Sequence, residues 1–258
     1  MSAASDLQNA ARRALVCLDL TNLDDDCDEA AVAELCRRAQ TPEGSVAAVC
    51  VWPRFVPQAR AALLHTGVRV ATVINFPSGE DDLDEAKGEA RAAVFDGADE
   101  IDMVIPWRAV LRAGDATMVA GLLHEIKDIT GEVPLKAILE TGELKDPVLI
   151  GLAAEAAIAG GANFLKTSTG KTPVGATPEA ARILLETIAR RDREVGFKAS
   201  GGVRTVEQAA AYLALADGIL GAGWAGPRRF RIGASGLLGE ILATLRADGA
   251  AGEDGEDY

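Results

Sequence analysis

Residues 163–172 read NFLKTSTGKT, and the two lysines in this stretch decide how the chain is interpreted. Lys166 closes a short apolar run that is typical of a buried strand, whereas Lys171 follows a glycine turn. A lysine at the end of a buried strand is costly to remove from water, so its charge must be compensated or removed. Lys166 is therefore a candidate nucleophile, a candidate phosphate ligand or an ordinary surface residue.

On both sides of this stretch, short apolar and β-branched runs alternate with longer segments whose apolar residues recur every three or four positions. Asp146, Thr177 and Thr205 are expected to cap three of the helices. Strands are predicted at residues 15–20, 46–51, 68–74, 100–105, 134–140, 162–166, 196–200 and 216–220. Helices are predicted at residues 28–39, 82–96, 117–130, 146–159, 177–191 and 205–215, and a helical pattern, LLGEILATL, follows residue 236.

Eight such repeats without an interrupting linker favour a closed (β/α)₈ TIM barrel over a doubly wound sheet. The first predicted strand is followed by DLTNLDDD rather than by the G-x-G-x-x-G pattern of dinucleotide-binding sheets. We predict a single barrel domain over residues 1–245. Residues 246–258 are rich in glycine and acid, and we expect them to form a flexible tail.

In a barrel of this kind, the chemistry lies where the strands end, because the carboxyl ends of the strands meet at one face. The polar residues and the one thiol at or near these ends are Asp19, Cys50, Asn75, Asp102, Glu140, Lys166 and Lys198. No histidine is among them, which disfavours a metal-dependent site. Cys50 is expected to be a small buried thiol, and the spacing of the four cysteines predicts neither a zinc site nor a disulfide framework.

Lys166 and Lys198 end neighbouring predicted strands, so their ammonium groups should converge in one pocket. Burial and the nearby like charge would both lower a lysine pKa and free the amine to attack a carbonyl. The alternative is that one lysine forms only a structural ion pair, for instance with Asp102 or Glu140. Asp102 lies mid-strand between apolar residues, where a carboxylate needs a partner, and with Lys198 it could transfer protons through a water.

The other acids allow less specific predictions. Asp99 and Glu100 lie near the start of the same strand and could face solvent at the opposite end of the barrel. Asp19 is as well explained by a hydrogen-bonding anchor as by a direct role in chemistry, and the same holds for Glu140.

Glycine-rich loops follow the strands on the side where barrels often bind phosphate. SGGVRT at residues 200–205 and RIGASG at residues 231–236 both lead into helical patterns, whose free N–H groups can bind an anion. Lys171 could contribute a positive charge to the same site or could be solvated. Arg204 could reach the phosphate or could instead cap a neighbouring loop.

The composition limits the partners of the chain. A net charge of −13 argues against general binding to nucleic acid or to an anionic membrane. The N-terminus lacks a signal-peptide pattern and no run is long enough to span a bilayer, so a cytoplasmic location is expected.

Together these motifs resemble the 2-deoxyribose-5-phosphate aldolase family. The stretches that carry the resemblance are LDLTNL, TPEGSVAAVCVWPRF, INFPSG, GADEIDMVIPWRA, LKAILETGELKD, GANFLKTSTG, GFKASGGVRT and RIGASGLL, between about residues 18 and 238. The resemblance implies a metal-free, cofactor-free class I aldolase with a (β/α)₈ barrel. Such an enzyme reversibly cleaves 2-deoxy-D-ribose 5-phosphate to D-glyceraldehyde 3-phosphate and acetaldehyde in deoxyribonucleotide catabolism. It commonly forms a homodimer or homotetramer.

Carried over residue by residue, the resemblance makes Lys166 the Schiff-base lysine, with Lys198 and Asp102 as proton donors and acceptors. It places the phosphate pocket on Gly170, Lys171, Gly201, Gly202, Val203, Arg204, Gly233 and Ser235. Gly236 departs from the family pattern, which has a second serine there, so the preference for a phosphorylated substrate is in question. Some members end in a tyrosine, so Tyr258 is either a further acid or base or a chain end without a role. The remaining alternatives are another Schiff-base lyase and a phosphosugar-binding barrel without activity.

Overall fold

The computed structural model describes residues 3–247, in which eight parallel strands close into a barrel. The strands follow one another around the barrel in chain order, and the last one pairs with the first. They are β1 (Leu18–Asn22), β4 (Ala48–Val51), β5 (Arg69–Ile74), β6 (Glu100–Val104), β7 (Leu135–Ile138), β8 (Phe164–Lys166), β9 (Gly196–Ser200) and β10 (Phe230–Ala234). The predicted (β/α)₈ fold is confirmed.

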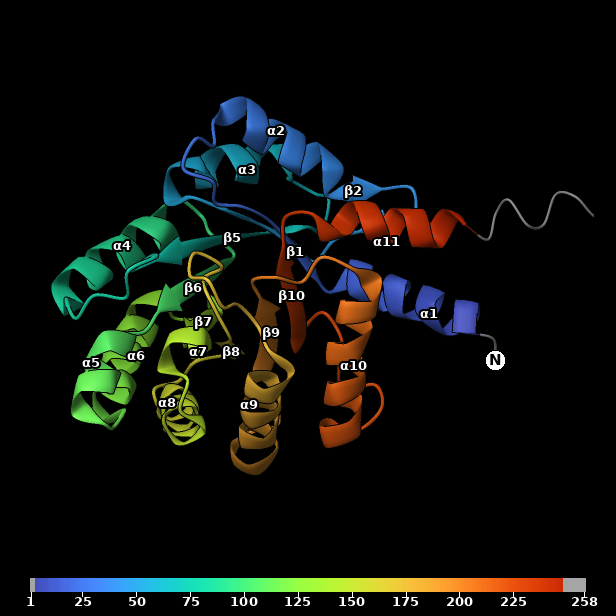
Figure 1. The fold of residues 1–258 in the computed structure, drawn as a ribbon. Coiled ribbons are helices and arrows are strands. Elements are labelled where there is room, and N and C mark those ends of the chain that lie inside the picture. The colour runs from blue at the N-terminus through green and yellow to red at the C-terminus, as the bar shows by residue number, and fades with distance from the viewer. Residues whose placement is uncertain (1–2, 248–258) are drawn as a thin grey trace, which may run out of the picture.

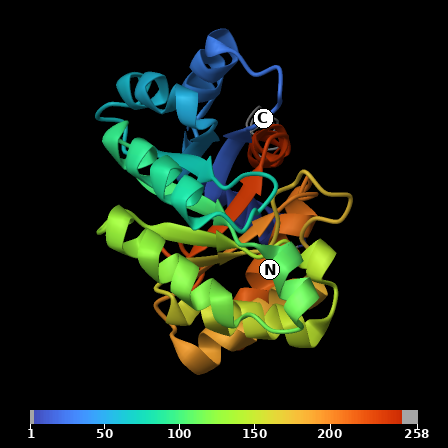
Figure 2. The same cartoon turned by 90° about the vertical axis from the view of Figure 1, so that its left-hand side faces the viewer.

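Helices surround the strands, as Figures 1 and 2 show. They are α1 (Ala3–Val16), α2 (Glu29–Arg38), α3 (Val56–Ala62), α4 (Leu83–Phe95), α5 (Trp107–Ala113), α6 (Thr117–Thr130), α7 (Thr141–Leu144), α8 (Pro147–Ala159), α9 (Pro178–Arg191), α10 (Val206–Leu220) and α11 (Leu237–Arg246). A two-stranded ribbon, β2 (Gln40–Thr41) with β3 (Gly44–Ser45), precedes β4, and a 3₁₀ turn, η1 (Pro53–Phe55), follows it. Among the described residues, no helix is long and apolar enough to cross a membrane.

The three predicted helix caps are present. Asp146 accepts a hydrogen bond from the N–H of Val148, and Thr177 accepts one from Ala180. Thr205 and Gln208 form a reciprocal capping box. These side chains satisfy N–H groups that the first turn of a helix leaves unpaired, so they fix where α8, α9 and α10 begin after their loops.

One predicted strand was wrong and another was only partly correct, and both lie where the barrel closes between its last and first strands. Residues 216–220 form the last turns of α10, and the eighth strand is Phe230–Ala234. The apolar run 15–20 belongs partly to α1, which ends at Val16, and partly to β1. Short apolar runs fit a strand and a buried helix equally well, and the tertiary packing decides between them. Here α1 packs against α10 and α11, and Arg13 forms an ion pair with Asp217 at 2.7 Å.

Candidate active site

Three residues predicted to act together meet inside the barrel. The register of β8 and β9 sets Lys166 beside Lys198, and Asp102 reaches both from β6. The Nζ atoms of Lys166 and Lys198 each lie 2.8 Å from Oδ2 of Asp102. Asp102 and Lys198 are fully buried and Lys166 is 2% exposed. The contact between Asp102 and Lys198 is direct, whereas the sequence-based hypothesis placed a water between them.

The two lysines differ in electrostatic environment. Burial lowers the pKa of Lys166, Lys198 lowers it further, and Asp102 only partly opposes them. Burial also acts on Lys198, but the carboxylates of Asp102 and Asp19 outweigh it and raise the Lys198 pKa above its usual value. Of the two lysines, Lys166 is therefore the one whose neutral amine is favoured by its surroundings, whereas the surroundings of Lys198 favour the protonated form.

A third buried lysine, Lys136 on β7, was not singled out in the sequence. Its Nζ atom lies 2.6 Å from Oδ1 of Asp102 and 2.7 Å from Oε2 of Glu100, and the side chain is fully buried. Asp102 therefore binds three ammonium groups. Burial alone would raise the Asp102 pKa, but these charges hold it well below its usual range. The signal that could have identified Lys136 is a lysine within the otherwise apolar run PLKAIL.

Glu100 corrects the expectation that it faces solvent. It is fully buried, and it binds Lys136 and Arg231, whose Nη2 atom lies 2.6 Å from Oε1 of Glu100. Although burial raises its pKa, these two cations lower it overall. Arg231, on β10, is 3% exposed. Like Lys136, it is a buried cation to which the sequence analysis assigned no role.

Asp19 and Glu140 act as anchors. Asp19 accepts hydrogen bonds from Lys198 at 2.5 Å and from Arg231 at 2.6 Å, and these cations lower its pKa despite complete burial. Glu140 accepts a 2.5 Å hydrogen bond from the hydroxyl of Thr169 and another from Thr172, so it fixes the loop after Lys166 rather than pairing with a lysine.

Cys50 lies on β4 and is fully buried, and burial raises the pKa of its thiol. The other cysteines, Cys17, Cys27 and Cys36, are also buried free thiols. The environment of Cys50 fits the packing role predicted for it, because a buried protonated thiol is a poor nucleophile.

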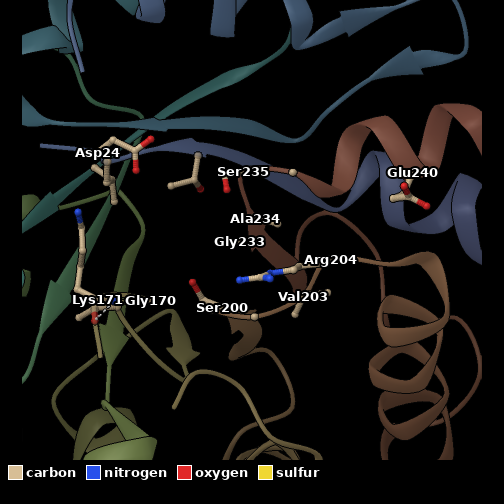
Figure 3. A pocket seen from close by; sticks show the side chains of 16 residues that line it. Asp24, Gly170, Lys171, Ser200, Val203, Arg204, Gly233, Ala234, Ser235 and Glu240 are labelled. Carbon is tan, nitrogen blue, oxygen red and sulfur yellow. Dashed lines mark hydrogen bonds between the residues drawn. The ribbon is translucent and has the colours of Figure 1, made fainter. Parts of the chain in front are cut away.

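A cavity of about 590 Å³ lies beside this cluster and is shown in Figure 3. All eight residues predicted to bind phosphate line it, as do Gly236 and the carboxylate residues Asp24 and Glu240. The guanidinium group of Arg204 points toward the middle of the cavity, whereas the side chain of Lys171 extends toward Asp24. The ammonium of Lys171 also lies 3.2 Å from Oδ1 of Asp25. The Asp25 side chain is exposed, so water can take its place as the partner of Lys171.

Glycines shape the cavity wall. Gly201 has a φ of +84°, and a Cβ there would lie 3.0 Å from the Cα of Gly175, so the loop after β9 requires glycine. A Cβ on Gly233 would lie 2.9 Å from Cε of Lys198 and 2.8 Å from Oγ of Ser200. Gly233 therefore lets the side chain of Lys198 pass close to the backbone of β10.

We expect Gly233→Ala to lower kcat by about 100-fold, because a displacement of about 1 Å at a catalytic group has an effect of this size. Steady-state kinetics would measure this loss, and thermal unfolding would show whether the fold is kept. Gly239→Ala is the control, since a Cβ there meets nothing within 4 Å and α11 should gain about 0.5–1 kcal/mol of stability. Equal kcat in the two variants would contradict the expectation.

Tyr258 lies outside the described residues. The tail was predicted to begin at residue 246, and α11 ends at Arg246.

Comparison with known proteins matches residues 13–236 to the model of the DeoC/LacD family aldolase. A Toxoplasma gondii ME49 protein, provisionally described as a deoxyribose-phosphate aldolase, is 27% identical with a TM-score of 0.85, over 95% of this chain and 97% of its own. A Coccidioides immitis protein with the same provisional description is 30% identical with a TM-score of 0.79, over 91% and 86%.

Deoxyribose phosphate aldolase from Aeropyrum pernix, described as having a unique tetrameric structure, is 26% identical with a TM-score of 0.72, over 96% and 99%. The family match covers most of the chain. The chain is an enzyme, an aldolase and thus a lyase, and it belongs to the DeoC/LacD aldolase family.

Proposed function

We propose that this aldolase reversibly cleaves 2-deoxy-D-ribose 5-phosphate to D-glyceraldehyde 3-phosphate and acetaldehyde through a Schiff base on Lys166. The observation that carries the proposal is the arrangement of the two lysines: Asp102 binds both, but only Lys198 is also bound by Asp19. The second carboxylate raises the pKa of Lys198, whereas burial lowers that of Lys166. The phosphate end of the substrate would lie among the glycine loops, next to Arg204 and Ser235. The names of the similar structures support the same substrate.

The chemistry begins with attack of the neutral Lys166 amine on the C1 aldehyde of the open-chain sugar, which gives a carbinolamine. The Lys198 ammonium, held by Asp19 and Asp102, donates a proton to the carbinolamine hydroxyl, and water leaves to form the iminium ion. Asp102 is ionised, because the neighbouring lysines, with Lys136 the strongest, hold its pKa well below its usual range despite its burial. Its role is to hold Lys166 and Lys198 within reach of the same substrate atom.

The C2–C3 bond then breaks, and its electron pair moves to the iminium group to give an enamine. The C3 hydroxyl loses its proton to the now neutral Lys198, so the three-carbon aldehyde phosphate is released. Lys198 returns this proton to C2 of the enamine, and hydrolysis of the resulting iminium ion releases acetaldehyde and restores Lys166. The route uses side-chain amines and water alone, which is why we propose an enzyme without metal or cofactor.

Trapping with borohydride tests the proposal. Acetaldehyde and borohydride should add one ethyl group to the chain, and peptide mapping should place it on Lys166. Lys166→Ala should abolish the adduct, and Lys171→Ala, at the second lysine of the same stretch, should keep it. An adduct on another lysine, or none, would refute the Schiff-base assignment. If the adduct forms on Lys166 but the enzyme does not condense acetaldehyde with glyceraldehyde 3-phosphate, the result would instead favour a Schiff-base lyase that acts on a different substrate.

We expect Arg204→Ala to raise KM for the phosphorylated substrate about 10- to 100-fold, because a hydrogen bond to a charged group contributes about 1.5–3 kcal/mol. KM for unphosphorylated 2-deoxyribose should stay the same. Arg37→Ala, which removes an exposed arginine from α2, is the matched control. Equal effects on both sugars would argue against a phosphate contact for Arg204.

Gly236 weakens the case for a strict phosphate requirement. It is the N-cap of α11 and makes no side-chain capping hydrogen bond, so the first turn of the helix presents backbone N–H groups without an added hydroxyl. Asp24 and Glu240 also line the cavity. We therefore propose that unphosphorylated sugars are accepted alongside the phosphate ester. The homo-oligomeric state predicted from the resemblance also remains a proposal.

A further inference from the structure

Two further cavities lie at the opposite end of the barrel, where the strands begin. Their volumes are about 220 and 340 Å³, and both are lined by Arg69, Arg228 and Arg231. Arg69 opens β5 and Arg231 is the second residue of β10, so this end is remote from the carboxyl ends of the strands, where Lys166 lies. We call these three side chains the arginine cluster.

The arginines differ in how far their hydrogen-bonding capacity is used. Arg231 is 3% exposed and binds Asp19, Glu100 and the carbonyl of Pro227. The side chain of Arg69 is 48% exposed and makes one 3.2 Å contact with Glu100, which leaves most of its donors available. Among residues 3–247, no carboxylate forms an ion pair with Arg228, and Glu194 in the same cavity pairs with Arg229.

The two carboxylates that line the smaller cavity, Glu100 and Glu194, already bind other cations. Inside the barrel, the cations Lys136, Lys198 and Arg231 pair with the carboxylates Asp19, Glu100 and Asp102. Arg69 and Arg228 add two positive charges near Glu100, whose carboxylate already binds the buried cations Lys136 and Arg231. A local excess of cations in a chain of net charge −13 is a feature that an anionic ligand would neutralise.

We propose that the arginine cluster binds a phosphate dianion, either free or as a small phosphate monoester. Guanidinium groups match phosphate oxygens through paired N–H donors, and the buried Arg231 supplies a rigid base for the site. The larger cavity, which Ser45, Val46 and Thr66 also line, has room for the organic part of a monoester. This site is separate from the glycine-loop cavity in which the sugar phosphate is proposed to react.

Calorimetric titration at low ionic strength tests the proposal. Inorganic phosphate and glycerol 3-phosphate are the probes, and every chain carries Arg204→Ala so that the glycine-loop cavity contributes little. In that background, Arg228→Ala should weaken phosphate binding roughly tenfold or more, and Arg69→Ala with Arg228→Ala should abolish it. Tighter binding of glycerol 3-phosphate would identify the monoester as the ligand, and equal or weaker binding would identify free phosphate.

The charge-matched control replaces Arg37 and Arg246, two exposed arginines that pair with Glu34 and Glu43. It should leave phosphate affinity unchanged, because these residues lie outside the arginine cluster. Equal affinities in the control and in the Arg69/Arg228 double variant would overturn the proposal. Thermal unfolding should confirm that the double variant is folded, and Arg69→Lys with Arg228→Lys, which keeps the charges, should restore part of the binding. The heat of binding does not depend on aldolase activity, so this test is independent of the proposed reaction.

Discussion

Replacing Lys198 with methionine is expected to lower kcat by about 10²–10⁴-fold, the usual contribution of a positioned proton donor. The structure gives the reason, since Lys198 keeps its proton and shares Oδ2 of Asp102 with Lys166. Removing it would also remove a positive charge that lowers the Lys166 pKa. The acidic limb of the pH profile of kcat/KM should therefore move to higher pH.

The measurement is the pH dependence of kcat/KM for wild type and Lys198→Met, with Lys171→Met as the control. Lys171 also loses one positive charge on substitution, but its ammonium pairs with exposed Asp25 and lies outside the buried cluster. Its acidic limb should stay in place. A Lys198→Met enzyme with the wild-type profile and kcat would show that Lys198 neither transfers protons nor influences Lys166.

The largest effect on stability is expected at Lys136. Its ammonium binds two fully buried carboxylates, Glu100 and Asp102, at 2.7 and 2.6 Å. Lys136→Met would leave both with one fewer buried cation, and breaking a buried ion pair from one side costs about 3–5 kcal/mol. Denaturant unfolding would measure the change in the free energy of unfolding. Lys87→Met, at a partly exposed pair with Glu125, should cost about 1 kcal/mol or less.

Adding Glu100→Gln to Lys136→Met should recover part of the loss, because the unbalanced carboxylate is removed. A Lys136→Met chain as stable as the Lys87→Met control would contradict this account.

The same cluster sets the stability at low and high pH. Asp19, Glu100 and Asp102 have lowered pKa values in the folded chain, so their contribution is present above the unfolded values near pH 4 and is lost as the pH falls toward the folded values. The pKa of Lys136 is raised, so its contribution is present below its unfolded value and is lost as the pH rises through the folded one. The free energy of unfolding should decline at both low and high pH. At low pH it should decline less steeply in the Lys136→Met/Glu100→Gln variant than in the wild type.

Most of the fold could be predicted because each unit carries local signals. The helix at residues 117–130 was placed correctly at both ends, and those after Asp146, Thr177 and Thr205 at their starts, since caps and apolar periodicity act within a few residues. The errors at residues 15–20 and 216–220 have a common cause. Both runs are short and mostly apolar, so the local pattern does not separate a strand from a helix. The packing of α1 against α10 and α11 makes one partly and the other entirely helical.

For the candidate site, the sequence by itself identified the polar side chains of the strands and the glycine-rich segments. The segment at residues 231–236 is not a loop after the eighth strand, because residues 231–234 belong to β10. It placed Lys166, Lys198 and Asp102 together, and the structure confirms their contact. Only Lys166 ends its strand, however, because Asp102 and Lys198 are the middle residues of β6 and β9. Only the tertiary structure showed that Lys136, Glu100 and Arg231 point into the same interior, since which face of a strand is buried depends on barrel closure. The tertiary structure also decided which lysine has a lowered pKa. That depends on how many carboxylates surround each ammonium, and these come from strands far apart in the chain.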